Sequence, residues 1–159
     1  MPAPTRGEYI RKFGEALRAQ KLKVSEQITK EAKKIISEGE GETQEVIDMC
    51  DFATGLSRQL YGLTMPSERP DHRLQEIWQP LGVVGCVTAF NFPVAVFGWN
   101  FCLAAVCGNS IIWKPSPHAE GCADLVKIFC DEVADEHNDL VLIKKGGTEA
   151  AIELAEDVG

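Results

Sequence analysis

Two short apolar runs, separated by a longer apolar stretch, stand out in residues 82–114. Residues 83–87 are mostly β-branched or small apolar residues, a pattern typical of a strand covered on both faces of a parallel sheet. Pro93 cannot continue a central strand and favours the start of a helix. Residues 110–113 form the second apolar run. This order predicts a parallel strand-helix-strand unit.

The predicted helix of this unit covers residues 94–107 and ends at Gly108, which favours a left-handed C-terminal residue. Apolar residues occur all round the helix, so we expect most of its circumference to be packed, Leu103 included.

Three amphipathic segments precede this unit in residues 1–64. The first begins with a capping box from Thr5 to Glu8, the second ends at the glycines Gly39 and Gly41, and the third begins near Glu42. Their apolar positions are Ile10, Phe13 and Leu17, then Val24, Ile28, Ile35 and Ile36, then Val46, Cys50, Ala53, Leu56 and Leu60. The spacing predicts a helical layer.

Residues 65–81 are polar and weakly alternating, which predicts a loop that enters an exposed edge strand and invites pairing with another chain. After the central unit, residues 120–137 predict a helix, 140–143 a third buried strand and 148–157 a last helix. The helix at 120–137 should turn Leu125, Ile128, Phe129 and Val133 inward.

These elements predict an α/β protein in which an amino-terminal helical layer is followed by an incomplete Rossmann-like parallel βαβαβα unit. We divide it into a helical segment at 1–64, a loop and edge strand at 65–81, and a truncated dinucleotide-binding domain at 82–159.

The composition is that of an ordinary folded protein, with 45% apolar and 25% charged residues and a net charge of −8. The negative charge argues against a nucleic-acid surface. We find no apolar run long enough to span a membrane and no secretory signal. We therefore expect a soluble, cytoplasmic protein that binds neither nucleic acid nor membranes.

The cysteines and charged runs suggest structural roles. Six cysteines fall inside predicted strands and helices without Cys-x-x-Cys spacing, so we expect buried, reduced thiols with raised pKa values and no metal site. The histidines His72, His118 and His137 show no metal-ligand spacing and are interpreted as surface residues. The alternating charges of residues 30–34 predict a solvated helix face.

Asn91 and Lys114 follow the two strands of the central unit. Open α/β sheets bind their ligands at the carboxyl ends of their strands. Both residues are therefore candidates for a ligand site.

The motif Ala-Phe-Asn-Phe-Pro at 89–93, followed by Cys-Gly-Asn and Trp-Lys-Pro-Ser, resembles the cofactor domain of the aldehyde dehydrogenase superfamily. The resemblance extends from residues 80–85 to Gly146-Gly147 and thus covers most of the chain. Residues 65–70 and 92–96 are similar to the branch that includes α-aminoadipic semialdehyde dehydrogenase, or antiquitin. Lys33 stands where the family has a glycine in its Glu-Ala-Gly-Lys segment.

The resemblance implies NAD(P)-dependent oxidation of an aldehyde to a carboxylic acid. It assigns to Asn91 an amide of the oxyanion hole, and to Lys114 a contact with the adenosine ribose of the cofactor. The other cofactor residues that it implies are Thr88, Ala89, Phe90 and Gly147. It implies NAD or NADP as the cofactor, with NAD slightly favoured. The choice stays open because Pro117 stands where many NAD-preferring relatives have a glutamate.

Each of these residues also has a structural interpretation. Asn91 is of a type that often caps or turns a strand-to-helix junction, and a lysine after a strand is commonly solvent exposed. Gly146 and Gly147 also suit a tight strand-to-helix turn. Ala151, in place of a family glycine, adds a methyl group on the adenine side.

In the family, the catalytic cysteine and general-base glutamate lie in the carboxyl-terminal portion, so the resemblance predicts a fragment that is inactive alone. The alternative is a non-catalytic regulatory subunit that associates with itself or with a full-length homologue through residues 65–81. A free-standing nucleotide-binding module is a third possibility.

Overall fold

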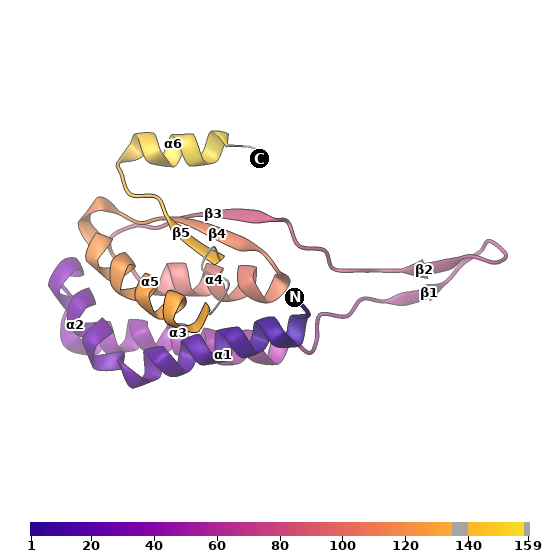
Figure 1. Ribbon diagram of the computed structural model, residues 1–159, viewed down its shortest axis with the longest axis horizontal. Helices are drawn as coiled ribbons and strands as arrows, with labels where there is room; N and C mark the ends of the chain where they lie inside the picture. The colour runs from indigo at the N-terminus through magenta and orange to yellow at the C-terminus, as the bar shows by residue number, and fades with distance from the viewer. Residues whose placement is uncertain (135–139, 158–159) are drawn as a thin grey trace.

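In the computed structural model, which describes residues 1–134 and 140–157, helices α1 to α3 form a layer beneath an α/β unit (Figure 1). We call these three helices the helical layer. The elements in chain order are α1 Ala3–Ala19, α2 Lys21–Ala32, α3 Ile36–Leu56, β1 Thr64–Pro66, β2 Arg73–Gln75, β3 Val83–Val87, α4 Ala95–Cys107, β4 Ser110–Lys114, a 3-10 turn Pro117–Ala119, α5 Glu120–Ala134, β5 Val141–Ile143 and α6 Thr148–Glu156.

The strands β3, β4 and β5 pair in that order, and both pairings are parallel. Their register places Val87 opposite Lys114 and Trp113 opposite Ile143. Helices α4 and α5 cover one face of this sheet, and α6 lies on the other (Figure 1). Alternating strands and helices therefore build a parallel α/β unit, which confirms the predicted fold class.

The prediction that β3 is covered on both faces is wrong. Val83 and Val87 are 65% and 55% exposed, whereas Cys86, which faces α4, is buried. On the opposite face, α6 reaches β3 at Gly85, where a Cβ atom would lie 3.3 Å from Leu154. Within the described sheet β3 is an edge strand, and α6 is too short to cover its whole outer face.

Helix α1 begins earlier than the expected capping box. Pro4 lies in its first turn, and the Pro2 carbonyl accepts hydrogen bonds from the amides of Thr5 and Arg6. Proline suits the first turn of a helix because the amide it lacks would have no partner inside the helix. The capping box from Thr5 to Glu8 is therefore a wrong prediction.

The boundary between α2 and α3 also differs from the prediction. Helix α2 ends at Ala32, and Lys33 takes the left-handed conformation, with φ 58°, that a glycine adopts more easily. Ile36 begins α3, and Ile35 and Ile36 are exposed. Gly39 does not end a helix: it lies inside α3, where an added Cβ would meet the Ser25 carbonyl oxygen at 2.7 Å. Close packing against α2 explains this glycine.

Three further apolar side chains predicted to be buried are exposed: Leu103 on α4, Ile128 on α5 and Leu142 on β5. About half of each side chain remains exposed, so no other described element covers it fully. On α5, the buried face instead contains Cys122, Ala123, Val126, Phe129, Cys130 and Ala134. The predicted end of this helix at His137 lies outside the described residues.

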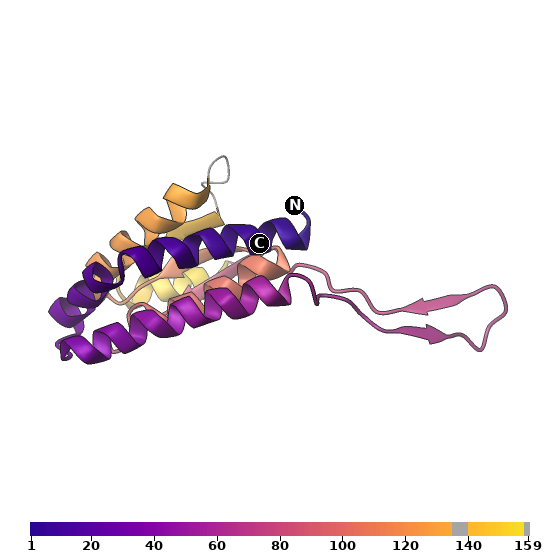
Figure 2. The same cartoon turned by 90° about the horizontal axis from the view of Figure 1, so that it is seen from below.

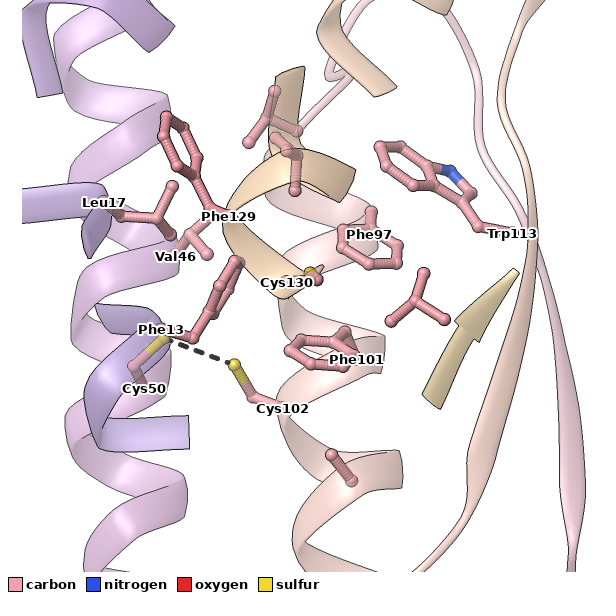
Figure 3. Packing of buried hydrophobic residues seen from close by; sticks show 14 of the residues in the cluster. Phe13, Leu17, Val46, Cys50, Phe97, Phe101, Cys102, Trp113, Phe129 and Cys130 are labelled. Carbon is pink, nitrogen blue, oxygen red and sulfur yellow. Dashed lines mark hydrogen bonds between the residues drawn. The ribbon is translucent and has the colours of Figure 1, made fainter. Parts of the chain in front are cut away.

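A chain of aromatic rings connects the helical layer to the sheet (Figure 3). Phe13 of α1 meets Phe101 of α4 edge to face, with ring centroids 5.2 Å apart. Phe101 stacks on Phe97, and Phe97 stacks on Trp113 of β4 with centroids 3.8 Å apart. All four side chains are buried. Aromatic pairs add to the stability gained from burial, so these four rings hold the helical layer, α4 and the sheet together.

Residues between the helical layer and β3 form a hairpin that projects from the body (Figures 1 and 2). Strands β1 and β2 pair antiparallel, with Met65 opposite Leu74. Every residue of both strands is exposed. Among the described residues, no helix is both long and apolar enough to cross a membrane.

Replacing Gly98 with alanine is expected to destabilise the protein. The new Cβ would lie 2.5 Å from a methyl carbon of Val46, so α3 and α4 must separate, at a cost of about 1–3 kcal/mol. Gly41→Ala is the matched control, because no atom lies within 4 Å of its Cβ and alanine favours the helix by about 0.5–1 kcal/mol. Urea unfolding measures the free energy of unfolding of both variants. A Gly98→Ala protein as stable as the parent would contradict the close packing of α3 against α4.

Candidate functional site

The carboxyl ends of β3, β4 and β5 lie side by side at one edge of the sheet. Val87 and Lys114 are paired, and the amide of Lys144 donates to the Trp113 carbonyl at 2.8 Å. Thr88 to Asn91 follow β3, Lys114 ends β4, and Gly147 lies four residues after β5. The topology therefore gathers every candidate site residue after strand ends of the same edge.

Thr88 has a structural role at this edge. Its side chain is buried, and its hydroxyl oxygen accepts a hydrogen bond from Trp113 Nε1 at 2.9 Å. Its amide donates to the Lys114 carbonyl at 3.1 Å and extends the pairing of β3 with β4. Thr88 thus links the aromatic chain to the edge where the candidate residues lie.

Lys114 is only 6% exposed, yet its ammonium group forms no hydrogen bond or ion pair within the described residues. Ala89 and Phe90, which follow the neighbouring strand, are exposed. The Phe90 ring meets the His118 ring edge to face, with centroids 6.2 Å apart. A cation without a protein partner among the described residues, on the strand beside the one that Ala89 and Phe90 follow, is suited to an electron-rich polar ligand.

Asn91 is exposed, and its side-chain amide makes no hydrogen bond within the described residues. It does not cap α4: the N-cap residue is Val94, and no side chain of the turn bonds the first amides of that helix. The capping interpretation of Asn91 is therefore wrong. Both amide hydrogens of Asn91 remain available to a ligand.

Glu42 of α3 supplies the cap that the turn lacks. Its Oε1 accepts hydrogen bonds from the amides of Val94 at 2.8 Å and Ala95 at 3.1 Å. Its Oε2 forms an ion pair with Lys34 Nζ at 3.0 Å. Sequence analysis missed this role, although a signal exists: Glu42 lies four residues before Val46 and eight before Cys50, on the apolar stripe of α3.

Glu31 of α2 does the same for α5. Its two carboxylate oxygens accept hydrogen bonds from the amides of Gly121 at 2.9 Å and Cys122 at 2.7 Å. Glu31 and Lys34 belong to the charged run that predicted a solvated face, and for these two residues the prediction is wrong. Glu31 also lies on an apolar stripe, three residues after Ile28 and seven after Val24.

Arg6 binds the opposite end of α4. Its Nε donates to the Val106 carbonyl at 2.7 Å, one of the carbonyls that a helix C-terminus leaves without a partner. Helix α4 therefore has a carboxylate at its N-terminus and a guanidinium at its C-terminus. Both charges come from the helical layer, and both complement the helix dipole.

The two glycines after β5 differ in conformation. Gly146 has φ 141°, a left-handed value that favours glycine, whereas Gly147 has φ −82° and precedes α6 without a side-chain cap. An added Cβ at Gly146 would meet the Ala150 Cβ at 2.8 Å. The turn thus needs the glycine at 146, and Gly147 is exposed.

The cysteines have the environment of structural thiols. Five of the six, all within the described residues, are buried, and Cys107 is half-buried. Burial raises the pKa of Cys86 to about 11 and also raises the pKa of Cys122 and Cys130. A hydrogen bond to Cys50, with Sγ atoms 3.6 Å apart, and burial raise the pKa of Cys102 (Figure 3). The described residues hold no group of metal-ligating side chains.

Comparisons with known proteins agree with this architecture. The model of the family described as "Aldehyde dehydrogenase family" matches residues 1–158. Aldehyde dehydrogenase family 7 member A1 of Malus domestica is 49% identical over 160 residues, which are 99% of this chain and 32% of that protein. α-Aminoadipic semialdehyde dehydrogenase of Rattus norvegicus is 55% identical over 117 residues, 74% of this chain and 22% of that protein.

A solved structure of lactaldehyde dehydrogenase superposes on this chain with a TM-score of 0.93 at 26% identity. The superposed region is 99% of this chain and 33% of the lactaldehyde dehydrogenase chain. The chain therefore spans about a third or less of the length of these relatives.

The thiols are expected to react slowly while the protein is folded. With a disulfide reagent at pH 8, we expect rapid reaction of at most one thiol, Cys107, and of all six after denaturation, because buried thiols with raised pKa values hold little thiolate. Cys107→Ser should remove the rapid phase. As the pH rises, Cys86 should react faster until about pH 11. Rapid reaction of two or more thiols at pH 8 would contradict this account.

Proposed function

This chain belongs to the aldehyde dehydrogenase family, and we propose that its residues contribute the oxyanion-stabilising amide and one wall of the NAD(P) site for oxidation of an aldehyde to a carboxylic acid. The supporting observation is the state of Asn91. Its amide is exposed at the carboxyl edge of the sheet and has no partner within the described residues, because Glu42 caps the adjacent helix. The amide is thus left available for a substrate oxygen.

Asn91 would act on the aldehyde oxygen. When a thiolate attacks the carbonyl carbon, that oxygen gains negative charge, and an amide N–H fixed at a strand end stabilises it without reorganisation. We do not assign the thiolate to the cysteines with raised pKa values, since a buried thiol is a poor nucleophile. We therefore expect the nucleophile and the general base to come from outside these 159 residues and the chain to be inactive alone.

The residues at the strand ends fit a dinucleotide. Lys114 offers an ammonium group with no protein partner within the described residues, which suits ribose hydroxyls or phosphate oxygens. Ala89 and Phe90 are exposed and follow the neighbouring strand β3, so they offer backbone and apolar surface at the same edge of the sheet. Gly147, at the N-terminus of α6, places no side chain in the way of a ligand. When bound, NAD or NADP supplies the hydride acceptor of the reaction.

The proposal predicts a specific effect of Asn91→Ala. Residues 1–158 would replace the matching third of a relative such as the Malus domestica protein, to give a complete enzyme. Asn91→Ala should lower kcat about 100- to 1000-fold, because one oxyanion donor is lost. Asn100→Ala is the control, since Asn100 is exposed on α4 and donates to its own helix. Equal activity of the two variants would refute the role of Asn91.

A second role, self-association or association with a full-length homologue, is favoured by the hairpin. Its strands are exposed along their whole length, and Met65 and Leu74 form an apolar pair on it. At its base, the Leu63 carbonyl accepts from the amide of Glu76 at 2.9 Å, and Trp78 Nε1 donates to the Tyr61 carbonyl at 3.2 Å. A hairpin held at its base and exposed along its edges is suited to pairing with another chain.

Leu74→Lys is expected to weaken association. Light scattering coupled to size-exclusion chromatography should show the parent as an oligomer and the variant shifted toward monomer, because a charge would be buried in the contact. Leu22→Lys is the control, since Leu22 is the same residue type and is also exposed, but lies on α2. A parent chain that is monomeric both alone and mixed with a full-length homologue would rule out this role.

A further inference from the structure

A buried ion pair lies directly behind the turn that carries Asn91. Lys34 Nζ and Glu42 Oε2 are 3.0 Å apart, and the two side chains are only 14% and 1% exposed. Lys34 lies between α2 and α3, and Glu42 lies in the second turn of α3, so the pair belongs to the helical layer. The turn belongs to the α/β unit. The contact therefore joins the two parts of the molecule next to the candidate site.

The pair contacts Phe92, the residue after Asn91, and the start of α4. Glu42 Oε1 accepts from the amides of Val94 and Ala95, at 2.8 and 3.1 Å. The Lys34 ammonium lies 3.6 Å from the centroid of the Phe92 ring, a cation–π contact. A charged acceptor fixes the direction of the helix start, and the cation fixes the ring beside it.

Asn91 has no such contact of its own. Its side chain makes no hydrogen bond within the described residues, so its position depends on the backbone of the turn. Replacing a buried ion pair by apolar residues is often neutral or stabilising, so such a pair is weak evidence of a contribution to stability. A role in geometry accounts better for a charged pair at this place.

We propose that Glu42 and Lys34 are positioning residues, which hold the turn of Asn91 and Phe92 so that the Asn91 amide points to a fixed place at the sheet edge. The inference rests on the proposed function of Asn91. An oxyanion donor must be held within about 0.5 Å of its productive position, and a displacement of about 1 Å costs ~100-fold in rate. The exposed turn would not supply such order by itself.

The test compares two caps of the same kind. In the 159-residue chain labelled with ¹⁵N, the backbone amides of Asn91 and Phe92 should have order parameters of about 0.85. Glu42→Ala should lower both below about 0.6. Glu31→Ala removes the corresponding cap of α5. Both variants should lower Tm, but Glu31→Ala should leave the order parameters of Asn91 and Phe92 unchanged. Unchanged order parameters in folded Glu42→Ala would overturn the inference.

Lys34→Met provides a second variant if Glu42→Ala does not fold, because it leaves both hydrogen bonds to α4 in place. It should lower the order of Phe92 and Asn91, and Lys34→Arg should restore it, since arginine keeps the charge. Unchanged order parameters of Asn91 and Phe92 in Lys34→Met would also contradict the inference.

Kinetics of the complete chimeric enzyme separate this inference from the proposed function. Glu42→Ala should lower kcat about 10- to 100-fold and leave the KM for the cofactor within about twofold. If Asn91→Ala has no effect while Glu42→Ala still disorders the turn, the proposed function fails and the positioning of the turn stands. If Asn91→Ala is costly but Glu42→Ala changes neither order nor kcat, the positioning inference fails.

Discussion

The first amides of α4 and α5 donate hydrogen bonds to carboxylates of the helical layer, and the rest of the structure depends on these contacts. An amide left buried without a partner costs about 1–3 kcal/mol, and α4 has no side-chain cap of its own turn. Glu42 and Glu31 provide the acceptors from α3 and α2. The two helices that cross between the strands are therefore placed by another layer, with Arg6 fixing the far end of α4.

The apolar contacts reinforce the same arrangement. The rings of Phe13, Phe101, Phe97 and Trp113 pass from the helical layer through α4 to the sheet. Trp113 then donates to Thr88, which is the first residue after β3. The carboxylate cap of α4 and the aromatic rings therefore both contact segments next to the edge of the sheet where the candidate residues lie. The geometry of that edge thus depends on the packing of helices that are far away in the sequence.

A few polar side chains near the sheet edge make no hydrogen bond or ion pair with the described residues. Asn91 and Lys114 have no side-chain partner within the described residues, although one is exposed and the other mostly buried. The cysteines show the opposite pattern, since burial raises the pKa of several of them and gives them the character of apolar residues. Polar side chains without a protein partner at the edge, and thiols of low nucleophilicity in the core, are compatible with the proposed division of chemistry.

The sequence by itself determined the order of strands and helices outside the β1–β2 hairpin, the left-handed end of α4 at Gly108 and the family, because these depend on local periodicity, turn residues and contiguous motifs. It predicted a single edge strand where β1 and β2 pair with each other. Only the tertiary structure decided which faces are covered. Val83, Ile128 and Leu103 are apolar but exposed, since burial depends on which element lies opposite. Gly39 looked like a helix stop and is a packing contact. Glu31 was predicted to lie on a solvated helix face, and Glu42 to mark the start of a helix. Their roles as caps could not be predicted, because the amides that they bind are some 50 to 90 residues away in the chain.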